Sequence, residues 1–297
     1  MPYLLLISFI WAFSFGLIKG NLTGLSPDFV AFSRIALALL LFLPFFRKKN
    51  MTFQEALSFT FIGAVQYGLM YLFFIRSCHY LPAHLIVLFT ACTPIYVTLI
   101  DNMMTKSFHL KHLIAAFIAF LGICALQYQN LEWKAEIIGI VFIQLSDLCF
   151  AFGQVAYKKI KQPSIQDSHI YALLFLGGAL ITALSTTLFG GWGSFFNISP
   201  KQTYLIVYLG IIASGLCFFG WNKAALKVKV GTLAVFNNIK IPLGVAVSIL
   251  FFDEKAKLPP LLLSSLFLLA ALFLTQKKSQ LTYWRQKPTP DILQNRE

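Results

Sequence analysis

Residues 137–157 read IIGIVFIQLSDLCFAFGQVAY, a stretch of 21 residues in which Asp147 is the one charged side chain. An α-helix that crosses a bilayer needs about 20 consecutive, mostly apolar residues. The chain contains ten blocks of this kind, at 3–18, 29–46, 56–75, 85–102, 113–127, 137–157, 170–189, 203–221, 231–252 and 258–275. The sequence therefore predicts an all-α integral membrane protein with ten transmembrane helices.

The composition and the distribution of charge agree with this prediction. Hydrophobic residues make up 58% of the chain and charged residues 12%, against roughly 45–50% and 25% in soluble domains. If both termini are cytoplasmic, sixteen of the 24 basic residues lie on the cytoplasmic side and six on the other, with Arg34 and Lys240 inside the membrane. Basic residues favour the cytoplasmic side, so we expect a bacterial inner-membrane protein with both termini in the cytoplasm and no nucleic-acid partner. The first block has no basic segment before it and is predicted to be a retained helix, not a cleaved signal peptide.

An internal repeat divides the chain. WAFSFGLIK at 11–19 is similar to FAFGQVAYK at 150–158, and LFTACTP at 88–94 aligns with FNNIKIP at 236–242. Each repeat then has five helices, and because five is odd the second repeat must be inverted relative to the first. We expect one repeat over 3–127, an inverted one over 137–275, and a cytoplasmic tail at 276–297. Inverted repeats are typical of secondary transporters, which bind substrate near the middle of the membrane.

The order of these features resembles the EamA-type transporters of the drug/metabolite transporter superfamily. The residues that carry the resemblance are Trp11 to Lys19, Pro27, Arg34, Tyr80 to Ala83, Pro94, Gly122, Pro242 and Glu254. The acidic residue of this pattern is present as Glu254 in the second repeat, but Lys106 stands at the matching position of the first. The resemblance implies substrates such as amino acids, amines, drugs, or S-adenosylmethionine exchanged for its demethylated product.

Two charged residues fall near the middle of predicted helices. Asp147 and Lys240 each lie about 14–15 Å along their helix, close to the centre of a ~30 Å hydrocarbon layer. A charge there costs roughly 2.5–3.5 kcal/mol, so both side chains should face the protein interior. Polar or small residues share their helix faces: Gln144, Ala151 and Gln154 with Asp147, and Asn237, Gly244 and Ser248 with Lys240. We therefore predict a polar cavity between these helices.

The role of the two charges is open to two interpretations. They form a static ion pair, or Lys240 meets a substrate carboxylate while Asp147 meets a substrate ammonium or a coupling proton. The residues expected to contact substrate are Lys240, Asp147, Asn237, Gln144, Gln154, Gln66, Trp11 and Tyr71. For Arg34, near the outer end of its predicted helix, we expect a structural role.

Two prolines are predicted to interrupt helices at matching positions. Pro94 and Pro242 lack a backbone N–H and should free the carbonyls of Thr90 and Asn238. These interruptions would serve as hinges or ligand contacts, and a packing kink is the alternative.

Several kinds of chemistry have no support in the sequence. His109 and His112 lack a third metal ligand, and no glycine-rich phosphate loop is present, so we expect neither a metal nor a cofactor. The function predicted is a secondary transporter, not an enzyme, that moves small polar or zwitterionic metabolites by alternating access with proton coupling or as an antiporter. The alternatives are a membrane-embedded enzyme acting on a lipid or isoprenoid and a passive channel. Its partners would be the substrate and the lipid bilayer, and a homodimer is left open.

Overall fold

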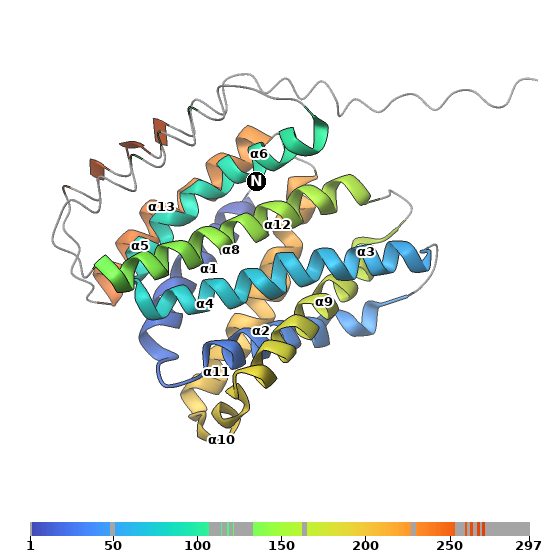
Figure 1. Ribbon diagram of the computed structural model, residues 1–297, viewed down its shortest axis with the longest axis horizontal. Coiled ribbons are helices and arrows are strands. Elements are labelled where there is room, and N and C mark those ends of the chain that lie inside the picture. The colour runs from blue at the N-terminus through green and yellow to red at the C-terminus, as the bar shows by residue number, and fades with distance from the viewer. Residues whose placement is uncertain are drawn as a thin grey trace, which may run out of the picture.

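The computed structural model describes residues 2–47, 51–106, 133–161, 165–226 and 230–252, with single positions inside 114–121 and 259–270. All regular elements within these residues are helices (Figure 1). Seven described segments are long and apolar enough to cross a membrane: Tyr3–Asn21, Pro27–Phe45, Phe53–Tyr80, Ala83–Met104, Glu136–Ile160, Asp167–Leu188 and Pro200–Ala224. The all-α prediction is confirmed for these residues. The predicted helices at 113–127 and 258–275 and the tail lie outside them, as do Gly122, Glu254 and the two histidines at 109 and 112.

The helices of the first half follow the predicted blocks closely. Their bounds are α1 (Pro2–Asn21), α2 (Pro27–Phe42), η1 (Leu43–Phe45), α3 (Phe53–Gly63), η2 (Ala64–Leu69), α4 (Met70–Tyr80), α5 (Ala83–Phe89), η3 (Thr90–Cys92) and α6 (Thr93–Thr105). Those of the second half are α8 (Trp133–Ile160), α9 (Asp167–Leu188), η4 (Gly191–Gly193), α10 (Ser194–Asn197), α11 (Pro200–Tyr208), η5 (Leu209–Leu216), α12 (Cys217–Ala225) and α13 (Val230–Phe251).

Two of the long helical segments contain a π-helical turn near their middle. The segment from α3 to α4 contains η2, and the segment from α11 to α12 contains η5. Both segments also begin with a capping box, in which Thr52 pairs with Glu55 and Ser199 with Gln202. The side chain of each cap satisfies backbone N–H groups that a helix start leaves without partners.

The two prolines of the repeat have different effects on the backbone. Before Pro94 the helix tightens into η3, and α6 then begins with Pro94 in its first turn, where a missing N–H costs nothing. The Thr90 carbonyl is not free, because the Thr93 hydroxyl donates to it over 2.7 Å. At residue 242 there is no matching interruption, and α13 is helical from Val230 to Phe251. A proline removes only one hydrogen bond from a helix, and a membrane helix that is packed on its neighbours tolerates this loss.

Glycines bring certain helices into very close contact. A Cβ atom at Gly63 in α3 would lie 1.8 Å from the Leu174 carbonyl oxygen in α9, and one at Gly177 would lie 1.8 Å from the Thr60 carbonyl oxygen. Small residues at such crossings let backbones approach, which stabilises helix pairs where no hydrophobic effect acts. The packing of α9 on α2, α3 and η2 is visible in Figure 1.

Large apolar side chains cover the outside of the bundle. Phe53, Tyr204 and Phe196 are each more than three-quarters exposed, and Leu188 and Leu250 nearly so. A soluble monomer rarely exposes extended apolar patches. Lipid tails would cover these side chains.

Candidate functional site

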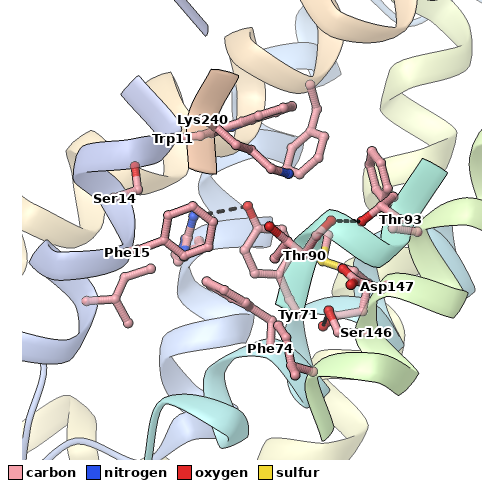
Figure 2. Close-up of a pocket in the computed structure, with 16 residues that line it drawn as sticks. Trp11, Ser14, Phe15, Tyr71, Phe74, Thr90, Thr93, Ser146, Asp147 and Lys240 are labelled. Carbon is pink, nitrogen blue, oxygen red and sulfur yellow. Dashed lines mark hydrogen bonds between the residues drawn. The ribbon is translucent and has the colours of Figure 1, made fainter. Parts of the chain in front are cut away.

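A cavity of about 90 Å³ lies inside the bundle (Figure 2). Helices from both halves of the sequence form its wall: α1, α2, α4, α6 and η3 from the first half, and α8, α12 and α13 from the second. Most of the lining is apolar and aromatic, with Trp11, Phe15, Phe74, Phe150 and Phe218 among the lining residues. Three ionisable residues that carry a formal charge at neutral pH interrupt this surface: Arg34, Asp147 and Lys240.

Asp147 and Lys240 lie on the same cavity wall, as the sequence predicts, but they do not form an ion pair. Both are buried, and no contact within 4 Å joins their charged atoms. Asp147 lies beside Thr93 and Ser146, and its Oδ2 atom is buried without a hydrogen-bond partner. Lys240 Nζ lies 5.7 Å from the ring centroid of Trp11, within range of a cation–π interaction. Figure 2 shows the lysine beside Trp11 and the aspartate beside Thr93.

Arg34 contacts two neutral hydroxyl groups in the cavity. Its Nη2 donates to the hydroxyl of Tyr71 over 3.0 Å and to that of Ser214 over 3.1 Å, and its Nε lies 3.3 Å from the same Ser214 oxygen. The guanidinium also lies 4.4 Å from the Tyr71 ring centroid. Nη1 is buried and has no partner. Arg34 is only 2% exposed.

The sequence places Arg34 too close to the helix end because it starts the helix at residue 29. The structure starts α2 at Pro27, so Arg34 lies seven residues, or about 10 Å, inside the helix. The expectation that a charge inside the membrane faces the protein interior, which is applied above to Asp147 and Lys240, applies to Arg34 as well. Ser214 carries no such signal, because a serine in an apolar block is common at helix contacts.

Trp11 and Tyr71 also line the cavity. The indole N–H of Trp11 donates to the Ala213 carbonyl in η5 over 2.9 Å. The Tyr71 hydroxyl lies 2.8 Å from the Ser214 hydroxyl. Both side chains therefore connect the first half of the chain to the π-helical turn of the second.

The three glutamines predicted to contact substrate are not among the lining residues. Gln144 accepts a hydrogen bond from the Tyr96 hydroxyl, and Gln154 lies two turns beyond Asp147 along α8. Gln66 is fully buried against Gly153, and neither polar atom of its side-chain amide has a partner. The face of α8 that lines the cavity carries Ile143, Ser146, Asp147 and Phe150, a spacing of three and four residues. The side chains of Asn237 and Pro242 lie outside the described residues.

A second cavity of about 240 Å³ lies near the ends of α1, α2 and α4. Lys19, Thr23, Cys78 and His79 are among its lining residues, and Ile18 borders both cavities. Beside it, Arg76 forms an ion pair with Asp28 over 2.7 Å, and Asp28 accepts a hydrogen bond from Ser185. Among the residues that the structure describes, Ile18 alone lines both spaces.

The comparisons with known proteins agree on one family. The sequence profile of the EamA-like transporter family matches residues 1–127. A probable biotin transporter of Pseudomonas aeruginosa is 34% identical over 279 residues, which cover 93% of this chain and 97% of the relative. The biotin transporters of Salmonella typhimurium and Escherichia coli are 31% identical over 283 residues, 93% of either chain.

A solved structure shares the fold. It is described only as the crystal structure of a protein, and it superposes on this chain with a TM-score of 0.62. The superposition covers 92% of this chain and 96% of the other at 13% sequence identity. At that identity the similarity concerns the fold alone.

Proposed function

The chain belongs to the EamA-like transporter family, and from this premise we propose that it is a secondary transporter that carries biotin across a bacterial inner membrane. It is a multi-pass membrane transporter and not an enzyme. The relatives that cover nearly the whole chain are named biotin transporters. Their names favour biotin over the amino acids, amines and S-adenosylmethionine that the family resemblance implies.

The observation that carries this proposal is the mixed character of the central cavity. Biotin has a ring with a ureido group, which offers two N–H donors and a carbonyl acceptor, and an apolar chain that ends in one carboxylate. Ligand sites are mostly apolar, with a few polar groups that fix orientation. The aromatic wall suits the apolar part of biotin, and the three ionisable residues suit its polar ends.

The roles proposed for Asp147 and Lys240 follow from their positions. Asp147 Oδ2 has no donor, so it is available to a ureido N–H or to a coupling proton. Lys240 lies over Trp11 and faces the negative charge of Asp147 through the cavity. Charged residues inside a membrane typically mark substrate paths and proton relays.

The proposed architecture is the ten-helix inverted repeat, and the helix contacts support it. α1 packs on α13, and α8 packs on α6. In the proposed repeat, α8 is the counterpart of α1, and α6 belongs to the counterpart of α13, so the two contacts are equivalent. The segment containing η2 packs on α9, and the one containing η5 packs on α2, again as counterparts. The two capping boxes and the two π-helical turns also fall in matching helices. Two halves related in this way can exchange conformations, which is the basis of alternating access.

Uptake measurements test the proposal directly. A bacterial strain that neither makes biotin nor imports it should grow on low concentrations of biotin when it expresses the chain, and should accumulate labelled biotin. Purified protein in liposomes should then take up biotin faster when a proton gradient is imposed, or when the liposomes contain unlabelled biotin if exchange is the mechanism. Cells with an empty vector are the control. Uptake of amino acids, amines or S-adenosylmethionine without uptake of biotin would contradict the proposed substrate.

A further inference from the structure

We propose that Arg34, held by Tyr71 and Ser214, binds the carboxylate of the transported substrate. This inference rests on the proposed function and names the group that recognises the acidic end of the molecule. It gives Arg34 the role that one of the two interpretations of the sequence gives to Lys240.

The geometry leaves one nitrogen of the guanidinium, Nη1, without a hydrogen-bond partner. Nε and Nη2 of Arg34 donate to Ser214 and Tyr71, while Nη1 is buried in the wall of the cavity without a partner. Tyr71 and Ser214 are themselves 3% and 0% exposed, and their hydroxyl groups lie 2.8 Å apart. A planar guanidinium fixed in this way offers its remaining N–H groups in a defined direction. These remaining groups belong to Nη1, from which a carboxylate would accept a charge-assisted hydrogen bond.

The balance of charge in the cavity identifies the ligand as an anion. Asp147 and Lys240, which carry opposite charges, line the same cavity. Among the described residues, no carboxylate lies within 4 Å of Arg34. The described part of the lining thus includes two cationic side chains, Arg34 and Lys240, and one carboxylate, Asp147. A buried cation without a partner is unfavourable, and a monocarboxylate brought by the substrate would neutralise it.

The backbone around Ser214 shows how the site is formed. In η5 the Ser214 hydroxyl donates to the Leu209 carbonyl, five residues earlier, over 2.8 Å. Gly210 lets this turn lie against α2, since a Cβ there would be 2.8 Å from Leu37 Cβ and 3.1 Å from the Arg34 carbonyl oxygen. Arg34 and Tyr71 come from the first half of the chain and Ser214 from the second. The site therefore joins the two halves, so that a relative movement of the halves changes how firmly the carboxylate is held.

The test compares biotin with biotin methyl ester, which keeps the ring and the chain but replaces the carboxylate with a neutral ester that is one methyl group larger. For the wild type we expect biotin to bind more tightly than the ester. Arg34→Met should weaken biotin binding by about 10- to 100-fold, the loss typical of a hydrogen bond to a charged group, and should leave ester binding unchanged or improved. Arg34→Lys should recover only part of the preference, because lysine keeps the charge but not the planar guanidinium that Tyr71 and Ser214 hold in place. Lys223→Met, which removes an exposed cation, is the control and should keep the wild-type preference.

The outcomes separate this inference from the proposed function. If the wild type does not bind biotin, the proposed function is wrong. If the wild type prefers biotin and Arg34→Met keeps that preference, Arg34 is not the anchor, and loss of the preference in Lys240→Met would assign the role to the lysine. Should Arg34→Met fail to fold, Tyr71→Phe and Ser214→Ala each remove one hydroxyl that positions Arg34. Each should lower the ratio of biotin to ester affinity, and an unchanged ratio in both would overturn the inference.

Discussion

At Asp147 a carboxylate oxygen is buried next to a cavity and has no hydrogen-bond donor. A structural carboxylate would be expected to find donors, because an unsatisfied buried polar atom is costly. The position therefore suits a group that exchanges partners during transport. Thr93 and Ser146 are nearby, but their hydroxyl groups donate to the carbonyls of Thr90 and Met70.

The prediction for this residue concerns proton coupling. Asp147→Asn should fold, because asparagine keeps the volume and the hydrogen-bonding capacity, but it should transport at least about tenfold more slowly, which corresponds to a barrier higher by roughly 1.4 kcal/mol. If protons drive import, wild-type uptake should rise as the external pH falls, and the variant should lose this dependence. Initial rates of biotin uptake across a range of external pH are the measurement. An unchanged pH dependence in Asp147→Asn would exclude Asp147 as the proton carrier.

Combining this change with Lys240→Met distinguishes a static ion pair from two separate roles. Breaking one side of a buried pair leaves an uncompensated charge, whereas removing both sides does not. The two side chains do not touch in this structure, so we expect the double variant to fold well and still fail to transport. Recovery of transport in the double variant would favour the static pair.

Some of the residues that line or support the cavity can be predicted from the sequence, and others depend on contacts that the sequence does not show. Asp147 and Lys240 are identified because charge is rare inside a membrane and its depth can be counted along a helix. The glutamines are predicted from helix position alone, and Gln144 turns toward Tyr96 on α6, a contact that periodicity cannot reveal. Ser214 owes its position to a π-helical turn, which shifts the register of the residues after it.

Among the helices, the third and eighth predicted ones show which features hydropathy can predict and which it cannot. Both are predicted as plain blocks, 56–75 and 203–221, whereas the structure extends them to Phe53–Tyr80 and Pro200–Ala224. The capping boxes at Thr52 and Ser199 account for the earlier starts. The π-helical turns inside both segments leave no mark in the hydropathy of the sequence, because they depend on packing against α9 and α2.

The crossing of α3 with α9 provides a stability prediction. Gly177→Ala should lower the free energy of unfolding by roughly 1–3 kcal/mol, since its Cβ would meet the Thr60 backbone and force the helices apart. Thermal unfolding in detergent, followed by size-exclusion chromatography, would measure this. Gly193→Ala is the matched control, because a Cβ there has no atom within 4 Å. Equal melting temperatures for the two variants would contradict the tight crossing.

At the scale of the whole molecule, contacts between distant loops fix which helix ends lie together. Ser26 N–H donates to the Ser194 hydroxyl, and Gln202 donates to the carbonyls of Asn21 and Thr23. The Asp28–Arg76–Ser185 network lies at the same ends of α2, α4 and α9. The opposite end carries Lys158, Lys159 and Lys161, with Lys161 paired to Asp167. Since basic residues favour the cytoplasmic side, the larger cavity beside Lys19 should open toward the outside.

The small volume of the central cavity indicates that the structure represents a closed state, without room for biotin. Its volume of about 90 Å³ is below the ~300 Å³ of the smallest typical ligand pockets. Biotin could enter only if the lining helices move apart. The larger cavity reaches the central one at Ile18, so movement of α1 at that residue would join them and give access from the outside.

The topology prediction follows from this orientation and tests the inverted repeat. Reporter fusions after Lys49, Lys161 and Lys229 should report the cytoplasm, and fusions after Lys134, Gly193 and Lys255 the outside. The fusion after Lys134 is the decisive one, because the predicted helix at 113–127 determines whether five or four helices precede it. With five, Lys134 is outside, and the second repeat starts from the opposite side and is inverted. A cytoplasmic signal at Lys134 would mean that only four helices precede it, and the two halves would then be parallel and unable to form the alternating-access arrangement proposed for this chain.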